Sequence, residues 1–325
     1  MNTEESSRVV EHIKIQEQMR IGTLLQQFDQ SGAFGAGCLA EAAAIYNQML
    51  TDPTTTVITA LAGAMVPGGM RRILRDMLAL KYTDVLITTG ANLTHDLIEA
   101  FGHHHLRNPP SASDVSLREQ GISRIHDVYL TNEAFILLEE RLQQLFDEIS
   151  PSQLEMIPPN RLLRELGLQI NDPNSFIATA AKKGIPIFCP ALTDSILGLQ
   201  LMLYAETHPI SLDPLADLKE LIRIAFEAES TGVLIIGGGV PKNYALQSAL
   251  ITGKGFRYAV QLTTDHPEAG GLSGATLNEA QSWGKLDPKA RFASVIADAT
   301  ITLPLLFAFA LDQNKGLERS ISSQK

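Results

Sequence analysis

The sequence is poor in cysteine and has no long apolar segment. Its 325 residues include two cysteines, Cys38 and Cys189, and neither belongs to a CxxC pair or to a cysteine and histidine spacing typical of zinc. We therefore expect no disulfide framework, no metal site, and a reducing compartment such as the cytoplasm. The longest apolar stretch, residues 295–311, is interrupted by Asp298 and is shorter than the ~18 residues of a membrane span. Residues 1–10 are polar and lack the pattern of a secretion signal, so we expect no membrane partner.

Positive charge is also scarce. The chain has 26 lysines and arginines against 36 aspartates and glutamates, which gives a formal net charge of −10 at pH 7. Such a balance argues against binding to a phosphate backbone, so no nucleic acid partner is expected. It favours cationic or neutral small molecules, and a polyamine is a suitable class.

Short β-branched runs alternate with helical periodicity along most of the chain. The expected strands cover residues 54–61, 84–90, 185–190, 233–236, 258–262 and 292–297. Repeated alternation of strand and helix predicts a parallel sheet. The fold class is therefore α/β: a Rossmann-like, doubly wound, mostly parallel sheet with helices on both faces. No linker divides residues 1–325, so we expect one domain.

Other segments predict local structure outside this sheet. Residues 11–29 have the apolar spacing of an amphipathic helix, and residues 108–127 read as a loop. Residues 100–175 as a whole are expected to form an irregular helical insertion. Its three consecutive histidines, residues 103–105, cannot easily converge on one ion, so we expect no metal there.

Small and polar residues gather where the expected strands end. A strand followed by glycines and a helix start is a geometry that binds a pyrophosphate, and carboxylates at such positions bind ribose hydroxyls. An ordinary turn between strand and helix is the alternative, because no GxGxxG pattern is present. The candidate cofactor-binding residues are Thr88, Thr89, Gly90, Asp194, Gly237, Gly238, Gly239, Thr264, Ser273, Ala297 and Asp298.

The only tryptophan, Trp283, lies two residues before Lys285. An indole face attracts organic cations, and a lysine in an apolar pocket can lose its proton and attack a C=N or C=O carbon. Glu279 adds a carboxylate that could anchor an ammonium group. A packing tryptophan beside a solvated lysine is the alternative.

Several spaced motifs resemble the deoxyhypusine synthase family, and the resemblance extends from about residue 20 to residue 311. They are Pro-Ala-Leu-Thr-Asp at 190–194, Ile-Ile-Gly-Gly-Gly at 235–239, Ser-Gly-Ala at 273–275, Ser-Trp-Gly-Lys at 282–285, Ala-Asp-Ala at 297–299, and Gly-Ile-Ser-Arg-Ile at 121–125. The resemblance implies a Rossmann-like fold, NAD as cofactor, and a homotetramer with active sites between paired subunits.

In that family NAD oxidises spermidine, a lysine carries the aminobutyl group as an imine, and a lysine of translation initiation factor 5A receives it. Lys285 matches the imine-forming lysine, and Trp283 and Glu279 match residues that hold the polyamine. The matches to cofactor contacts are Asp194, Asp298, Thr264, Ser273 and the glycine turn at 237–239.

The chain also departs from the family pattern. Asn243 and Tyr244 stand where histidines are usual, one of which contacts substrate, and we expect Tyr244 to contact substrate here. Leu199, Ala269 and Leu272 replace acids. Losing an acid from a polycation pocket costs about 1–3 kcal/mol. We therefore expect a deoxyhypusine synthase-like, NAD-dependent transferase of an aminobutyl or related alkylamine group. The alternatives are homospermidine synthase, in which putrescine accepts the group, true deoxyhypusine synthase, and an NAD-binding regulatory protein without turnover.

Overall fold

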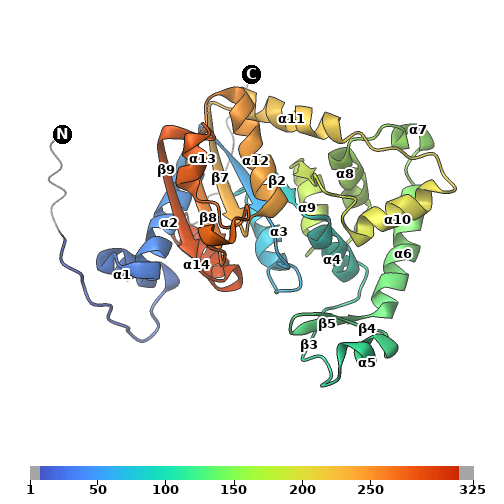
Figure 1. The fold of residues 1–325 in the computed structure, drawn as a ribbon, viewed down its shortest axis with the longest axis horizontal. Coiled ribbons are helices and arrows are strands. Elements are labelled where there is room, and N and C mark those ends of the chain that lie inside the picture. Colours follow the sequence, from blue (N-terminus) through green and yellow to red (C-terminus); the bar gives the residue numbers. More distant parts are fainter. Residues whose placement is uncertain (1–7, 315–325) are drawn as a thin grey trace.

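A six-stranded parallel sheet forms the centre of the molecule (Figure 1). The computed structural model describes residues 8–314. The strands are β1 (Thr55–Leu61), β2 (Val85–Thr88), β6 (Ile187–Phe188), β7 (Ser230–Ile236), β8 (Phe256–Thr263) and β9 (Leu286–Ile296). Their order is β6-β2-β1-β7-β8-β9, and every neighbouring pair is parallel. The predicted fold class is confirmed.

The order of the strands reverses direction between β1 and β7. The chain proceeds from β1 outward to β2 and β6, returns to the centre as β7, and then proceeds the other way to β8 and β9. In open sheets of this type, the loops that follow the two central strands diverge and leave a crevice at the carboxyl edge. The carboxyl ends of β1 and β7 are in register, with Leu61 opposite Ile236.

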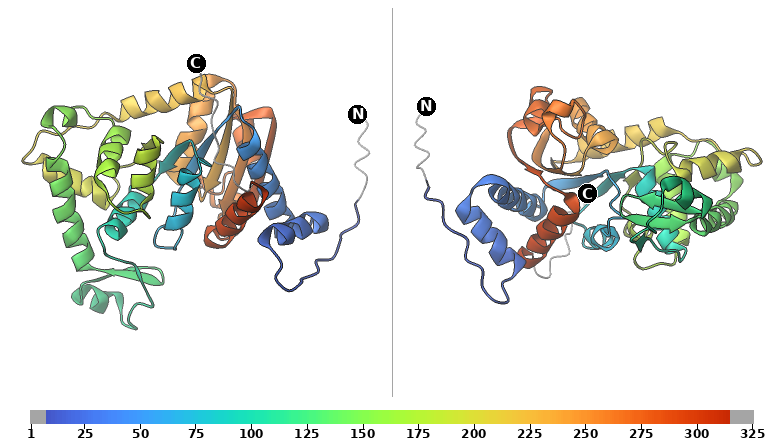
Figure 2. Two further views of the ribbon diagram at one scale, coloured as in Figure 1. Left: turned by 180° about the vertical axis from the view of Figure 1, so that it is seen from behind. Right: turned by 60° about the horizontal axis from the view of Figure 1, so that its bottom comes forward.

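Helices cover both faces of the sheet (Figure 2). Consecutive side chains of β7 alternate between two apolar clusters, as side chains on a strand must. Leu234 and Ile236 pack in the cluster that includes residues of α2 (Phe34–Thr51) and α14 (Ala299–Gln313). Val233 and Ile235 pack in the cluster that includes residues of α12 (Gly239–Thr252). Being covered on both faces explains why these strands are continuous apolar runs.

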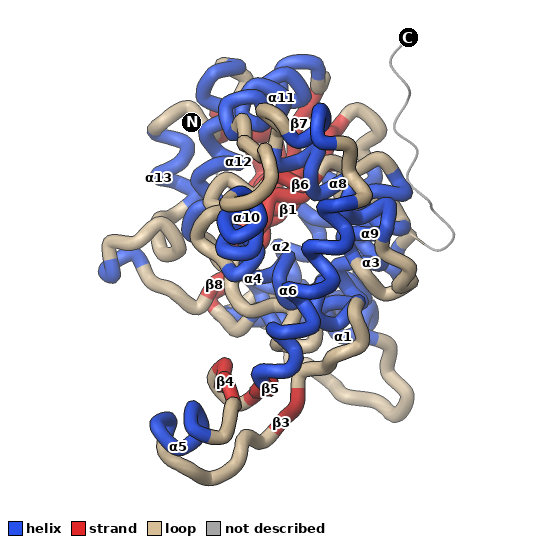
Figure 3. The backbone as a smooth tube through the Cα atoms, turned by 90° about the vertical axis from the view of Figure 1, so that its right-hand side faces the viewer, coloured by secondary structure: helices blue, strands red, loops and turns tan. Residues whose placement is uncertain are grey.

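The remaining helices surround this core (Figure 3). They are α1 (Ile21–Ser31), α3 (Arg71–Ala79), α4 (Gly90–Ala100), α6 (Asn132–Asp147), α7 (Pro151–Leu154), α8 (Pro159–Gln169), α9 (Phe176–Lys183), α10 (Ile196–Ala205), α11 (Pro214–Glu227) and α13 (Leu277–Ser282), with one turn of 3-10 helix at Pro267–Ala269. Within residues 8–314, none of the helices has both the length and the apolarity for crossing a bilayer.

Residues 106–131 form a small sheet of their own, which we call the β-lobe. Its strands β3 (Leu106–Arg107), β4 (Ile122–Ile125) and β5 (Val128–Thr131) pair antiparallel in the order β3-β5-β4, and α5 (Asp114–Glu119) precedes β4. The predicted loop over residues 108–127 is therefore wrong for residues 114–119, which form a helix, and for residues 122–125, which form a strand. Ser113 caps α5 by accepting a hydrogen bond from the Ser116 amide. This cap is a local signal for a helix start, and a prediction based on the spacing of apolar residues does not detect it.

The predicted helix over residues 11–29 is wrong in its first half. The helix begins at Ile21, and Gly32 ends it in the left-handed conformation with φ 60°. Ile13 and Ile15 remain 40% and 69% exposed, so the first half of the expected helix would bury no apolar face. A helix in a protein gains most of its stability by burying an apolar face. Residues 11–20 bury none and form no helix.

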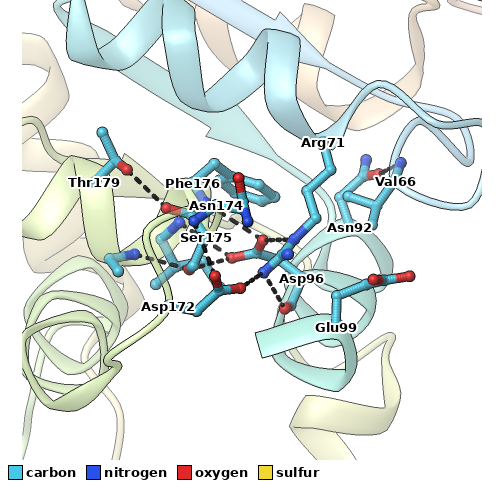
Figure 4. Close-up of polar contacts among 12 residues, drawn as sticks. Val66, Arg71, Asn92, Asp96, Glu99, Asp172, Asn174, Ser175, Phe176 and Thr179 are labelled. Atoms are coloured by element: carbon cyan, nitrogen blue, oxygen red, sulfur yellow. Dashed lines mark hydrogen bonds and ion pairs between the residues drawn. The ribbon is translucent and has the colours of Figure 1, made fainter. Parts of the chain in front are cut away.

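A buried carboxylate joins three helices near the sheet (Figure 4). Asp96 of α4 accepts a 2.6 Å bond from Nε of Arg71 at the start of α3, and Arg71 also bonds Asp172 at 2.7 Å. The other oxygen of Asp96 accepts from the Ser175 hydroxyl at 2.6 Å and from the Ile177 amide at 3.2 Å, at the start of α9. Burial raises the pKa of Asp96, and the Arg71 charge opposes that shift. These bonds fix α4, whose first turn lies at the carboxyl edge of the sheet.

We predict that Asp96→Ala lowers the free energy of unfolding by about 3–5 kcal/mol, because it leaves the Arg71 guanidinium partly buried without its main partner. Urea unfolding followed by circular dichroism measures the loss. Asp76→Ala is the matched control on α3, since Asp76 pairs with Arg75 at a site where the side chains are 42% and 29% exposed, and it should change stability by less than about 1 kcal/mol. Equal losses in the two variants would contradict this account.

Candidate functional site

A cleft of about 1270 Å³ lies at the carboxyl edge of the sheet, where the strand order reverses. One side is formed by residues 62–69 after β1, the glycine turn after β7, residues 262–265 of β8 and its loop, and residues 298–300 at the start of α14. The other side is formed by Glu99 of α4, His105 and the β-lobe. Five of the predicted cofactor residues line this cleft, namely Gly237, Gly238, Thr264, Ser273 and Asp298.

The glycine turn allows two backbone segments to touch. Gly237 has φ 75°, a conformation that favours glycine. A Cβ on Gly238 would lie 2.3 Å from Cα of Ser273, so no other residue fits there without moving the loop that carries Ser273. Gly239 then begins α12, and the amides of a first helical turn attract anions. The turn therefore has the strand-to-helix backbone that the sequence predicts, and its binding of a phosphate group stays a prediction.

The start of α14 brings a second helix terminus to the cleft. Asp298 caps this helix, because one of its carboxylate oxygens accepts bonds from the amide and the hydroxyl of Thr300 at 2.7 and 2.8 Å. Its side chain is exposed and lines the cleft. Ala297 continues β9 by donating its amide to Thr263, and it is not among the lining residues.

Other predicted residues have local structural contacts at the same edge. Thr89 caps α4 through the Asn92 amide, and Gly90 lies so close to α10 that a Cβ would be 2.3 Å from Oγ of Ser195. Thr88 is buried, and its hydroxyl has no hydrogen-bond partner among the described residues. Asp194 is exposed in the loop before α10. None of these four lines the cleft.

Asn92 at the start of α4 also shapes the cleft. Its side-chain amide donates to the Gly63 carbonyl at 3.0 Å, and its oxygen accepts from the Val66 amide at 3.4 Å. These bonds hold the loop after β1 against α4 (Figure 4). Sequence spacing gave no signal for this partner, which is 26 to 29 residues away.

A buried lysine fastens the glycine turn to the loop that follows β8. The Lys242 side chain belongs to α12, is 2% exposed, and donates to the Gln261 side chain at 3.1 Å and to the Ala275 carbonyl. Gln261 in turn donates to the carbonyls of Gly237 and Ser273 at 3.1 and 2.9 Å. Burial lowers the pKa of Lys242 to about 8. We call this set of bonds the Lys242–Gln261 network.

Lys285 and Trp283 lie together as the sequence predicts. The ammonium nitrogen of Lys285 is 5.5 Å from the centre of the Trp283 ring system, although the indole is 62% exposed. The Lys285 carbonyl accepts from the Phe256 amide, which places this backbone at the amino ends of β8 and β9. Lys285 is therefore absent from the lining of the carboxyl-edge cleft. The charges of Glu279 and Lys285 both act on buried Lys242, so this group adjoins the Lys242–Gln261 network.

Tyr244 lies on α12 and packs against the apolar cluster that includes Leu246 and Leu221. Burial, with a smaller effect from the charge of Asp217, raises the pKa of its phenol. It does not line the cleft, and its role as a substrate contact stays a prediction.

The three consecutive histidines adopt separate environments. His104 and His105 each bond a different oxygen of Glu99, at 2.8 and 2.7 Å. Within residues 8–314, no group of three histidine, cysteine, aspartate or glutamate side chains is arranged to hold a metal ion. Glu99 and His105 line the cleft, and the sequence gave no sign that the glutamate would be the partner of these histidines.

Comparison with known proteins points in one direction. The family model described as deoxyhypusine synthase matches residues 23–310. A "Probable deoxyhypusine synthase" of Methanosarcina thermophila is 47% identical over 310 residues, which cover 94% of this chain and 96% of the relative. One from Methanothermobacter thermautotrophicus is 41% identical, covering 94% and 98%. A crystal structure of a candidate deoxyhypusine synthase from Entamoeba histolytica superposes with a TM-score of 0.67 at 20% identity, covering 97% of this chain and all of that one.

We predict that Lys242→Met flattens the pH dependence of stability on the alkaline side. The pKa of Lys242 falls from 10.5 to about 8 on folding, so the unfolded chain binds this proton over a window in which the folded chain does not. The contribution of Lys242 to stability therefore rises as pH increases from about 8 to 10.5. Urea unfolding across that window measures it, with exposed Lys219→Met as the control. An equal pH dependence in both variants and the wild type would rule out this effect.

Proposed function

The chain belongs to the deoxyhypusine synthase family, and from this premise we propose that it is an NAD-dependent transferase that moves an aminobutyl or related alkylamine group through an imine on Lys285. The observation that carries the proposal is the retained Lys285 beside the Trp283 indole, 5.5 Å from its ring centre. Membership of the family supports transferase chemistry. The identity of the amine, the use of NAD and a role in polyamine metabolism belong to the proposal.

The chemistry expected of Lys285 follows from its surroundings. A lysine must be neutral to attack the carbon of an oxidised amine. Trp283 and Glu279 would hold the ammonium group of the bound amine, through the indole face and through a carboxylate.

The carboxyl-edge cleft suits NAD. The backbone of Gly237 and Gly238 lines the cleft just before α12 begins, so a pyrophosphate bound there would meet the first turn of that helix. The exposed carboxylate of Asp298 would accept a bond from a ribose hydroxyl, and Thr264 and Ser273 line the same cleft. When bound, NAD would accept a hydride from the amine and later return it. Thr88, Thr89, Gly90, Asp194, Gly239 and Ala297 would act by shaping the edge of this site.

A second subunit would explain why Lys285 does not line the cleft. In one chain the Lys285 backbone lies at the amino end of β8, whereas the cleft lies at the carboxyl edge of the sheet, and Trp283 is exposed. We propose a homotetramer in which active sites lie between paired subunits, so that the cleft of one chain faces Lys285 of the next. Closing the site in this way would also exclude water from the lysine.

The replaced acids favour a substrate other than spermidine with initiation factor 5A. Leu199 and Leu272 are 54% and 45% exposed, so these positions present apolar surface where the family has carboxylates. A donor or acceptor with fewer cationic groups would suit such a pocket. Homospermidine synthase, with putrescine as acceptor, is the first alternative, and true deoxyhypusine synthase is the second. An NAD-binding regulator without turnover is the alternative outside enzymes.

We predict that Lys285→Ala abolishes covalent capture of the alkylamine. Protein is incubated with NAD and each of a panel of amines, including spermidine and putrescine, and is then reduced with borohydride. Mass spectrometry should find the added group on the peptide containing Lys285, and turnover in the variant should fall on the order of 10³-fold or more. Lys289→Ala, at an exposed lysine of β9 four residues after Lys285, should retain both.

The products separate the alternatives. Homospermidine from putrescine identifies homospermidine synthase, and label transferred to initiation factor 5A identifies deoxyhypusine synthase. No adduct with any amine would reject the transferase proposal and favour the regulator, whose function Lys285→Ala should leave intact.

We predict that Gly238→Ala weakens NAD binding by at least about tenfold, because the new Cβ must displace Ser273 or the glycine turn that faces the pyrophosphate. Isothermal titration calorimetry of NAD measures the change. Gly35→Ala on α2 is the control, since a Cβ there meets nothing within 4 Å. Equal affinity in Gly238→Ala and wild type would place the cofactor elsewhere.

A further inference from the structure

One face of α4 lies beside the cleft. Asn92, His95 and Glu99 are spaced three and four residues apart, so they lie on the same side of the helix. Asn92 holds the loop after β1, and Glu99 lines the cleft. In Figure 4 the Asp96 carboxylate points toward Asp172 and Ser175, whereas Glu99 points away from them. His95 lies between Asn92 and Glu99 on this face, directly behind the residues that line the cleft.

A continuous chain of hydrogen bonds runs along this face. Oε1 of Glu99 bonds Nδ1 of His105 at 2.7 Å and also accepts from the His105 amide at 3.0 Å. Nε2 of His105 bonds Nδ1 of His95 at 3.0 Å, and the two rings meet edge to face with centroids 4.9 Å apart. The His105 side chain is 6% exposed, so the middle of this hydrogen-bond chain is shielded from water.

The carboxylate determines which nitrogens carry protons. The Glu99 pKa is lowered to about 2 by its bonds to the two histidines, against the effect of burial, so Glu99 is ionised and can only accept. Nδ1 of His105 must then donate, which leaves Nε2 of neutral His105 as an acceptor. Nδ1 of neutral His95 must donate to it. Nε2 of His95 is left with a free lone pair, and it has no protein partner in the described part of the chain.

We propose that Glu99, His105 and His95 form a proton relay in which Nε2 of His95 takes a proton from an ammonium group bound in the cleft. The N–H bond of the ammonium breaks, its electron pair stays on the amine nitrogen, and an N–H bond forms at Nε2 of His95. The proton on Nδ1 of His95 moves to Nε2 of His105. The amine becomes neutral, and the positive charge comes to rest on His105, beside the Glu99 carboxylate.

The relay has a chemical purpose in amine oxidation. A protonated amine has no lone pair and cannot release hydride, so a base must first remove its proton. Alone, His95 is a weak base, because burial and the charge of His105 lower its pKa to about 4. Passing a proton on to His105 places the charge next to a carboxylate instead. The other titratable groups near the relay or lining the cleft around it are His104, Arg107, His126 and Asp127.

This inference rests on the proposed function, and the experiment separates the two. Exchange of the imidazole C2 hydrogen, followed by mass spectrometry across a pH series, reports the titration of each histidine in the intact protein without any turnover. Wild type is compared with Glu99→Gln, His95→Gln and His104→Gln, with and without NAD and spermidine. His104→Gln is the matched control, because His104 bonds the other oxygen of Glu99 but is 69% exposed at its side chain.

We expect Glu99→Gln to shift the titration of His95 downward by about 1 pH unit, and His104→Gln to leave His95 unchanged. Spermidine should slow C2 exchange at His95 in the wild type. In steady-state assays of an active wild type, His95→Gln should lower kcat at least about tenfold, and Glu99→Gln should move the acidic limb of the pH profile downward. Added imidazole should restore activity to His95→Ala, which a structural role would not allow.

The relay is overturned if the titration of His95 is independent of Glu99, or if His95→Gln retains the wild-type rate across the pH range. A wild type that forms no adduct with any amine rejects the proposed function alone. In that case the C2 exchange of His95, with and without spermidine, still decides for or against the relay.

Discussion

The parallel pairing of β1 with β7 is the constraint on which the site depends. The two strands run in register from Thr55 opposite Ser230 to Leu61 opposite Ile236, buried on both faces. Because they end side by side, the loop after β1 and the glycine turn after β7 must diverge from a common line. The cleft follows from that divergence, and hydrogen bonds from neighbouring elements hold both loops. Asn92 holds the first loop, and the Lys242–Gln261 network holds the second.

Different polar groups line the two sides of the cleft. The chain carries a net charge of −10, and one side of the cleft is lined by the glycine turn before α12 and by the first residues of α14. At the far side of the cleft, the Glu99 carboxylate orders two imidazoles. The anionic cofactor and the cationic substrate that we propose would thus bind at neighbouring parts of one cleft, whatever the net charge of the chain.

Sequence patterns predicted the features that depend on local or repeated signals. The buried strands could be predicted from β-branched runs, and the glycine turn could be predicted from three consecutive glycines. Lys285 and Trp283 are two residues apart, so their contact needs little from the fold. Hydrogen-bond partners far apart in the sequence could not be predicted. Asp96 bonds Ser175 across 79 residues, and Gln261 of β8 bonds Gly237, which follows the neighbouring strand β7. The helix expected over residues 11–29 failed for a related reason, since burial of an apolar face depends on what the rest of the chain places beside it.

The β1–β7 pairing also affects how the chain folds. Thr55 and Ser230, which bond through their hydroxyls, are 175 residues apart, and every residue between them must be synthesised before the central pair of strands can form. During that interval β1 has β2 on one side and an unpaired apolar edge on the other. Exposed edges of this kind recruit other strands, and pairings between distant segments form slowly. The centre of the sheet, which is the most buried part of the finished protein, is thus among the last parts to close, and the nascent chain is most open to aggregation before β7 emerges.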